Sequence, residues 1–343
     1  MRCHAPAHEP FLNTSGVRDE RCVFMTGVST NVSVYLPGLL CIARRLEQVG
    51  SQVPLVIAVP AAEVALARAA LSNINATILV WRQFPVELKL RWGQRRWRGR
   101  HVLDKLNLLG APYRRLVWLD TDVLIRRNVD ALCSSTAGRW SRASFAAAVD
   151  SGFEPRTCWQ SGGARCDSCR HHGVHPDELC EHKCSHWVRR GIMEQAAGNR
   201  SGMPRCVYEF NSGVMLIAPL SRANFQRRVV RVLRCDRPPS REGWSRDGGD
   251  QGVLNNLVHG RRVMGDRVGV LPSKYNGLHR VSALRPQAWR RWDPALVHIV
   301  GERKPWSEGI GSALLPHATN EEQPIGFAAM SFEWLQLCGV PTP

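Results

Sequence analysis

The sequence predicts an α/β protein with a mainly parallel central sheet and helices on both of its faces. Short runs of β-branched and other apolar residues alternate with helix-like stretches through the first 125 residues, which is the pattern of consecutive β-α-β units. A continuous apolar run such as "VPLVIAV" at 53–59 is typical of a strand buried on both faces, as strands of a parallel sheet are.

The individual elements follow from the same periodicity. Strands are expected at 22–28, 53–59, 76–81, 115–125, 144–150, 210–219 and 295–301. Helices are expected at 37–49, 61–73, 102–110 and 250–258. Between them, about 151–206 is rich in Cys, His, Gly and Arg and is interpreted as an insertion. The predicted organisation is an N-terminal extension at 1–21, one domain at 22–310 that carries the insertion, and a C-terminal tail at 311–343.

The chain is strongly basic, with 46 Lys and Arg against 29 Asp and Glu and a net charge of +17. Such a charge favours anionic partners. The densest basic run, "RWGQRRWRGR" at 91–100, carries Trp92 and Trp97, which could stack on nucleic-acid bases. The alternative is a solvated loop whose arginines lie over the tryptophan rings. We favour the loop, so nucleic acid is not an expected partner.

Localisation stays open between two compartments. No apolar run reaches the roughly 18 residues that a membrane span needs, and the first 20 residues lack the apolar region of a signal peptide. The chain as written is therefore expected to be cytoplasmic, or in the Golgi lumen if its N-terminus is incomplete. Four glycosylation sequons, at Asn13, Asn31, Asn75 and Asn199, favour a secretory location.

Asp120 and Asp122 follow the apolar run Leu116–Leu119 in "RRLVWLDTDVLI". If one strand continues through them, both side chains point to the same face. Buried carboxylates need a cation, and oxygen ligands suit Mg²⁺ or Mn²⁺. Ligands of parallel sheets bind at the carboxyl ends of the strands, where this pair would lie. The alternative is that the strand has ended and both acids are solvated in a turn.

Seven sequence blocks together resemble glycosyltransferase family 8, the retaining enzymes that include glycogenin and galactinol synthase. The resemblance depends on the order and spacing of the blocks over about residues 22–306. The blocks are "YLPGLLCIARRL" (35–46), "LDKLNLL" (103–109), "VWLDTDVLIRRNVDAL" (117–132), "FNSGVMLI" (210–217), "DGGDQGVLN" (247–255), "LPSKYN" (271–276) and "HIVGERKPW" (298–306).

The resemblance implies a GT-A fold, the Rossmann-like fold of nucleotide-diphospho-sugar transferases, and a UDP-sugar donor held with a divalent ion, Mn²⁺ or Mg²⁺. It places the metal ligands at Asp120, Asp122 and His298. An imidazole ligand shifts the preference from Mg²⁺ toward Mn²⁺. Taken alone, His298 could equally be a core histidine bonded to a carbonyl.

The resemblance also implies how the donor is bound. Tyr35 matches the aromatic residue that stacks on uracil, and Lys105 matches a donor-site lysine; a core tyrosine and a surface lysine are the alternatives. Gly301 lets the backbone approach the ligand, and Lys304 supplies a charge for the diphosphate. The implied donor-binding set is Tyr35, Lys105, Asp120, Thr121, Asp122, Asp150, Asn211, Ser212, Gly301 and Lys304.

At the sugar end, the resemblance implies a catalytic set of Asp250, Gln251, Asn211 and Lys304. The new bond is expected to keep the configuration of the donor. The favoured route is front-face attack, in which the acceptor hydroxyl gives its proton to the departing phosphate oxygen. A double displacement would need a carboxylate nucleophile, for which Asp250 is the nearest candidate. The alternative for this glycine-rich segment is a loop in which Asp250 caps a helix.

Two features depart from the family. The chain has only four tyrosines and none directly after Asn276, so glycogenin-like self-glucosylation is not expected and the acceptor is a separate sugar, polyol, lipid or protein glycan. A homodimer is left open. The insertion carries six cysteines that could hold structural Zn²⁺, form disulfides in an oxidising compartment or stay unpaired: Cys158, Cys166, Cys169, Cys180, Cys184 and Cys206.

A second class of function is a catalytically inactive, basic protein that binds zinc or nucleic acid on a glycosyltransferase scaffold. Loss of one metal ligand would favour it. Because Asp120, Asp122 and His298 are all present, the sequence favours the enzyme.

Overall fold

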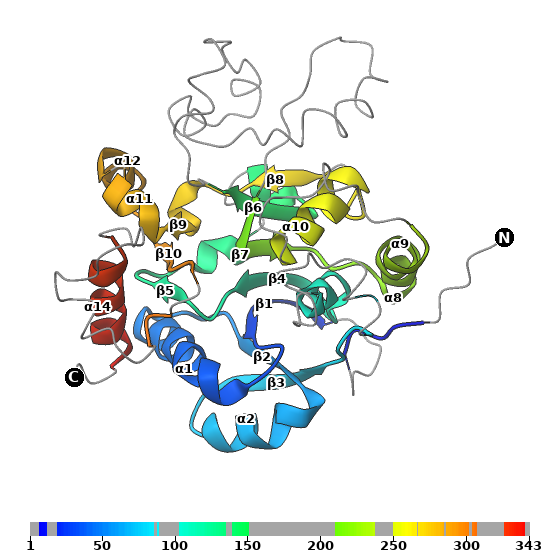
Figure 1. Cartoon of the computed structure of the whole chain (residues 1–343), viewed down its shortest axis with the longest axis horizontal. Helices are drawn as coiled ribbons and strands as arrows, with labels where there is room; N and C mark the ends of the chain where they lie inside the picture. The colour runs from blue at the N-terminus through cyan, green and yellow to red at the C-terminus, as the bar shows by residue number, and fades with distance from the viewer. Residues whose placement is uncertain are drawn as a thin grey trace, which may run out of the picture.

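The fold is described from a computed structural model (Figure 1). It describes residues 7–11, 19–85, 88, 103–134, 139–150, 210–236, 250–265, 267–284, 286–301, 304–306 and 326–339. The basic run at 91–100 and the six cysteines of the predicted insertion lie outside these residues.

A seven-stranded sheet forms the centre of the molecule, with the strand order β3-β2-β1-β4-β7-β6-β8. Its strands are β1 (Asp19–Gly27), β2 (Leu55–Pro60), β3 (Ala76–Trp81), β4 (Tyr113–Leu119), β6 (Phe145–Val149), β7 (Phe210–Ile217) and β8 (Val268–Val270). Six strands run in one direction, and β7 is antiparallel to both neighbours, β4 and β6. The predicted mainly parallel α/β sheet is confirmed.

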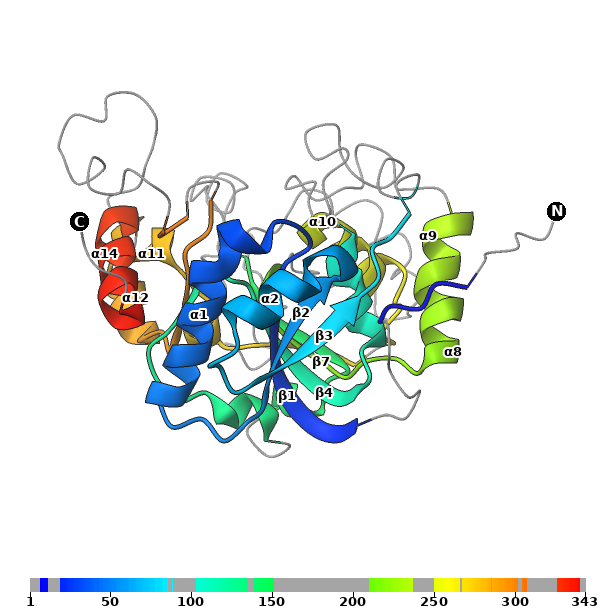
Figure 2. The ribbon, with the colours of Figure 1, turned by 90° about the horizontal axis from the view of Figure 1, so that it is seen from below.

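Helices cover both faces of this sheet, as the sequence predicts (Figures 1 and 2). The helices α1 (Val32–Gln48) and α2 (Val64–Ala70) pack on one face, in one apolar core. A second core covers the other face. The elements that contribute to it are the 3-10 helix η3 (Asp104–Gly110), the continuous helix formed by α8 (Arg222–Phe225), η6 (Gln226–Val230) and α9 (Arg231–Cys235), and α10 (Asp250–Asn255) with its π-helical continuation η8 (Asn256–Gly260).

The helix α1 begins five residues earlier than predicted, at Val32 instead of Pro37. Its first turn is capped from another element: the Glu63 carboxylate accepts hydrogen bonds from the backbone N–H groups of Asn31 and Val32. This long-range cap satisfies amide groups that a helix start leaves unpaired, and the local sequence gives no signal for it.

The expected strand at 115–125 is two strands in two different sheets. β4 ends at Leu119, and β5 (Val123–Ile125) belongs to a three-stranded sheet of order β5-β10-β9. β10 (Leu296–His298) pairs antiparallel with β5 and parallel with β9 (Gly277–Leu278). The predicted continuous strand is therefore wrong. The apolar run indicates that both parts are buried, but it does not indicate which strands they pair with.

The break in this strand places Asp120 and Asp122 in a turn. Thr121 and Asp122 form its corner, and the backbone N–H of Val123 donates to the carbonyl of Asp120. The expectation that strand alternation points both carboxylates to one face is thus incorrect. The turn itself brings them together, as the next section describes.

Described segments near both ends of the chain pack against the domain. Phe11 is buried and forms an isolated bridge with Trp81 at the free edge of β3. The helix α14 (Gly326–Cys338), within the predicted tail, lies beside α1 (Figure 1) and is joined to it by a disulfide between Cys41 and Cys338. Among the residues that the structure describes, the remaining α-helices are α11 (His279–Leu284) and α12 (Pro286–Trp292). Among the described helices we find none whose length and hydropathy would let it span a lipid bilayer.

Candidate active site

The antiparallel strand β7 explains why distant residues meet at one edge of the sheet. Leu119, at the end of β4, pairs with Val214, and Val149, at the end of β6, pairs with Phe210. Because β7 runs the opposite way, its first residues lie where β4 and β6 finish. Asn211 and Ser212 therefore meet the turn after β4 and the residue after β6.

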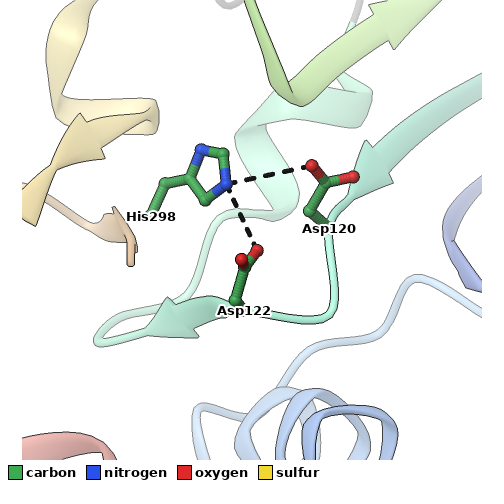
Figure 3. Close-up of side chains that lie close together, drawn as sticks. All are labelled: Asp120, Asp122 and His298. Atoms are coloured by element: carbon green, nitrogen blue, oxygen red, sulfur yellow. Dashed lines mark ion pairs between the residues drawn. The ribbon is translucent and has the colours of Figure 1, made fainter. Parts of the chain in front are cut away.

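Asp120, Asp122 and His298 form a candidate metal site at this edge (Figure 3). One ligand atom from each residue lies within 4.8 Å of the others. His298 Nε2 is 3.2 Å from Asp122 Oδ1 and 3.8 Å from Asp120 Oδ2. The side chains of Asp122 and His298 are each only 6% exposed, whereas that of Asp120 is 22% exposed, so the two acids and the imidazole converge in a partly buried place.

The hydrogen bonds of Asn211 fix the tautomer of His298. The Asn211 Oδ1 atom accepts from the backbone N–H of Gly213, which can only donate, so this atom is the amide oxygen. His298 Nδ1 lies 2.9 Å from the same oxygen and must donate to it. In the neutral imidazole, Nε2 then carries the lone pair and faces Asp120 and Asp122, as a metal ligand requires.

Gly213 provides the room for this imidazole. A Cβ at this position would lie 2.1 Å from His298 Nδ1 and Cε1, closer than atoms can approach. Oxygen and imidazole ligands, one fixed tautomer and a space held open by glycine all fit a divalent ion, and the mixed N/O ligand set suits Mn²⁺.

Two lysines flank the carboxylates. Lys304 Nζ lies 2.5 Å from Asp122 Oδ2, and Lys105 Nζ lies 2.8 Å from Asp120 Oδ1 and 2.5 Å from Asp250 Oδ2. Burial works against the charge of Asp122, but Lys304 and His298 outweigh it and hold the pKa of Asp122 below its usual range. Burial dominates at Asp120 and raises the pKa of that carboxyl. Added positive charge would thus stabilise Asp120 in particular.

A directed chain of hydrogen bonds connects the candidate metal site to Asp150. Asn211 Nδ2 donates to Gln251 Oε1, which also accepts the backbone N–H of Ser212. The oxygen of Gln251 is thereby assigned, and its Nε2 donates to Asp150 Oδ2 over 2.8 Å. Because Asn211 also bonds to His298, one network holds five residues: His298, Asn211, Ser212, Gln251 and Asp150.

Trp306, two residues after Lys304, packs against the start of α1 beside Tyr35. The ring of Tyr35 meets the ring of Trp306 edge-on, with centroids 6.4 Å apart, and Trp306 Nε1 donates to the carbonyl of Val34. Gly301 adopts a φ of 138°, which favours glycine. The loop with Lys304 is thus attached to the first turns of α1.

Thr121 sits at the corner of the turn between Asp120 and Asp122 and is buried. A Cβ on Gly38 of α1 would lie 2.4 Å from the carbonyl oxygen of Thr121. This glycine lets α1 press directly against the turn, which fixes the positions of the two acids.

The structure brings most of the residues that the sequence assigns to the site close together, but their roles stay predictions and some have other contacts. Asp250 is not a free carboxylate, because it pairs with Lys105 and accepts from Ser212 Oγ. Several contributors carry no assignment in the sequence analysis, among them Asn276, which donates to Asn211 Oδ1, and Trp118, which donates to Asp120. For Asn276 the only signal was its place in the "LPSKYN" block.

Comparisons with known proteins identify the family of the chain and its fold. The family model for glycosyl transferase family 8 matches residues 103–309. The galactosyltransferase LgtC, solved with donor and acceptor sugar analogues, has a TM-score of 0.52 and 18% identity, covering 93% of this chain and 97% of its own. An active-site variant of LgtC gives 0.51 and 17% over the same shares of the two chains.

A weaker structural match is mouse xyloside xylosyltransferase 1 in its apo form. It has a TM-score of 0.43 and 15% identity, covering 82% of this chain and 97% of its own. Among curated protein sequences, none matches this chain.

The fold is that of the GT-A glycosyltransferases. The family match spans more than half of the sequence, and the chain belongs to glycosyltransferase family 8.

Proposed function

We propose that this chain moves a sugar from a UDP-sugar to the hydroxyl group of a separate acceptor, with a divalent ion, Mn²⁺ or Mg²⁺, and with retention of configuration. The observation that carries the proposal is the convergence of Asp120, Asp122 and His298 between two partly buried lysines. The lysines offset part of the cost of burying the carboxylates, and a divalent ion between the three side chains would offset the rest.

The residues around the cluster suit a nucleotide diphosphate. Asp120, Asp122 and His298 would hold the ion, which when bound neutralises the diphosphate and stabilises the departing phosphate oxygen. Lys304 lies beside Asp122 and can turn its ammonium toward the same oxygen. Tyr35, half-buried against Trp306, offers a ring face on which uracil would stack.

The sugar would lie against the network of Asn211, Gln251 and Asp150. Its amide and carboxylate groups offer both donors and acceptors for hydroxyl groups. Gln251 Oε1 already accepts two hydrogen bonds and Nε2 donates one to Asp150. The network therefore presents a fixed polar surface, which favours one arrangement of sugar hydroxyls over others.

Retention is proposed to follow the front-face route. The acceptor hydroxyl donates its proton to the departing phosphate oxygen, and the new C–O bond forms on the face that the phosphate leaves. The alternative needs a free carboxylate nucleophile. Asp250 is held by Lys105 at 2.5 Å and by Ser212 Oγ at 3.3 Å, and Gln251 is neutral, so front-face attack is favoured.

The test is a hydrolysis screen with UDP-glucose, UDP-galactose, UDP-xylose and UDP-glucuronate in Mn²⁺. We expect UDP release from at least one donor, suppression by EDTA, and loss of that release in Asp122→Ala. Asp236→Ala is the control, because Asp236 pairs with Arg261 at the far end of α9 and its loss should leave the rate unchanged. Release of UDP from no donor, or equal rates for wild type and Asp122→Ala, would overturn the proposal.

A further inference from the structure

Trp118 lies on β4, two residues before Asp120. Strand alternation places both side chains on the same face of the sheet, and the backbone of Asp120 keeps the strand geometry because its N–H donates to the carbonyl of Gly213. The indole is 2% exposed. It stacks on Trp81 with ring centroids 6.1 Å apart.

The indole N–H of Trp118 donates to Asp120 Oδ1 over 2.6 Å. A buried indole N–H needs an acceptor, and here the acceptor is a candidate metal ligand. Lys105, whose ammonium lies 5.8 Å from the centre of the Trp118 ring, contacts both oxygens of Asp120, at 2.8 Å for Oδ1 and 3.1 Å for Oδ2. Lys105 alone therefore does not select one orientation of the carboxylate.

Trp118 does select one, because it contacts Oδ1 only. With Oδ1 held by the indole, Oδ2 faces His298 Nε2 at 3.8 Å. We propose that Trp118 is a positioning residue, which turns Asp120 so that one oxygen is committed to the protein and the other to the divalent ion. The inference rests on the proposed function, since it assigns a partner to the metal ligand of that site.

Trp118→Phe in the full chain tests the role. The substitution keeps an aromatic ring in the core but removes the N–H donor. Loss of a residue that orients a metal ligand typically weakens metal binding about 10- to 100-fold. We expect calorimetry with UDP to show a Kd for Mn²⁺ raised by about tenfold or more, while UDP binding in EDTA stays as in wild type.

Trp81→Phe is the matched control. Trp81 is equally buried and stacks on Trp118, but its indole nitrogen has no hydrogen-bond partner among the described residues. Trp81→Phe should perturb packing as much as Trp118→Phe does and leave the affinity for Mn²⁺ within about twofold. In hydrolysis assays, Trp118→Phe should raise the Mn²⁺ concentration needed for half the maximal rate far more than it lowers kcat at saturating Mn²⁺.

A second measurement does not depend on the folding of Trp118→Phe. In protein labelled with ¹⁵N-tryptophan, Asp120→Ala removes the acceptor, so one indole N–H resonance that is shifted downfield in wild type should move upfield. An indole spectrum unaffected by Asp120→Ala would overturn the inference. So would equal affinity for Mn²⁺ in Trp118→Phe and Trp81→Phe. If wild type itself binds UDP equally with and without Mn²⁺, the proposed function fails instead.

Discussion

His298 Nδ1 lies 2.9 Å from Asn211 Oδ1, a contact between residues 87 positions apart in the sequence. The contact makes Asn211 a partner of the candidate metal ligand as well as a neighbour of Gln251. Sequence resemblance places Asn211 at the sugar, whereas the geometry gives it a second task, to keep His298 in the tautomer that can bind a metal.

Asn211→Ala should therefore weaken Mn²⁺-dependent binding of UDP about tenfold or more. UDP carries no sugar, so a residue that contacts only the sugar would leave its affinity unchanged. Asn255→Ala is the control, because Asn255 is also buried and bonds to Phe210 but does not touch His298. Calorimetry measures the Mn²⁺-dependent affinity for UDP in both variants. An unchanged affinity in Asn211→Ala would show that Asn211 does not orient His298 and contacts only the sugar.

Gly213→Ala should displace His298, because the added Cβ would lie 2.1 Å from the ring. We expect loss of Mn²⁺-dependent UDP binding with the fold retained, measured by calorimetry and circular dichroism. Gly269→Ala makes the same change in β8, where the nearest atom to the new Cβ is the Cβ of Ala143 at 3.0 Å. That variant should bind as wild type; a Gly213→Ala protein that also binds normally would contradict the described position of His298.

Stability should fall between about pH 6.5 and pH 4 through His279. Burial, with help from the positive charge of Arg280, lowers the pKa of His279 to about 4 from its ordinary 6.5. Between these pH values the unfolded chain binds more protons than the folded one, so the free energy of unfolding falls with decreasing pH. The stability that depends on neutral His279 is fully present above pH 6.5 and is lost as the pH falls through 4. The loss is on the order of 3 kcal/mol.

Urea unfolding of wild type and His279→Phe across this pH range measures the effect. Carboxylates titrate in the same window in both proteins, so the difference between the two curves reports His279. The unfolding free energy of His279→Phe should fall less steeply with decreasing pH. Parallel curves would show that His279 does not titrate as its burial requires.

The disulfide between Cys41 and Cys338 should stabilise the position of the loop with Lys304 as well as the fold. It joins α1 to α14, and Trp334 of α14 packs on Trp306, two residues after Lys304, with ring centroids 5.3 Å apart. Replacing both cysteines by serine should cost about 2–5 kcal/mol of stability and weaken UDP binding.

The second disulfide, between Cys22 and Cys133, is the comparison. Its double serine variant should lose stability but retain affinity for UDP, because neither residue contacts the loop with Lys304. Denaturant unfolding and calorimetry separate the two effects, and non-reducing electrophoresis checks that each bond forms. Equal UDP affinities in the two double variants would show that the position of α14 does not affect the loop with Lys304.

Local patterns predicted the strands and helices that depend on burial alone. Runs such as Leu55–Pro60 and Phe210–Ile217 are buried throughout, and most of their residues are apolar. The break between β4 and β5 was not predictable, because pairing of Val123–Ile125 with Leu296–His298 is a contact between segments that are about 170 residues apart and leaves no mark in "LDTDVLI".

The candidate site shows the same division. The candidate ligands Asp120, Asp122 and His298 were identifiable because the sequence blocks that contain them resemble glycosyltransferase family 8 and because metal chemistry restricts which residue types can serve. The residues that orient them were not, since an indole or an amide can serve many purposes in a core. For Trp118 a weak signal existed: it stands two positions before Asp120 on an expected strand, where both side chains share one face.

Calorimetric titration of wild-type protein with UDP, in Mn²⁺ and again in EDTA, is the direct test of whether the site binds UDP through a divalent ion. One ligand atom each of Asp120, Asp122 and His298 lies within 4.8 Å of the others, so a divalent ion would bind between them and would in turn hold the diphosphate of UDP. The account predicts that UDP binds in Mn²⁺, that binding weakens at least tenfold in EDTA, and that Asp122→Ala binds equally poorly in both. Equal affinity of wild type for UDP in Mn²⁺ and in EDTA would contradict it.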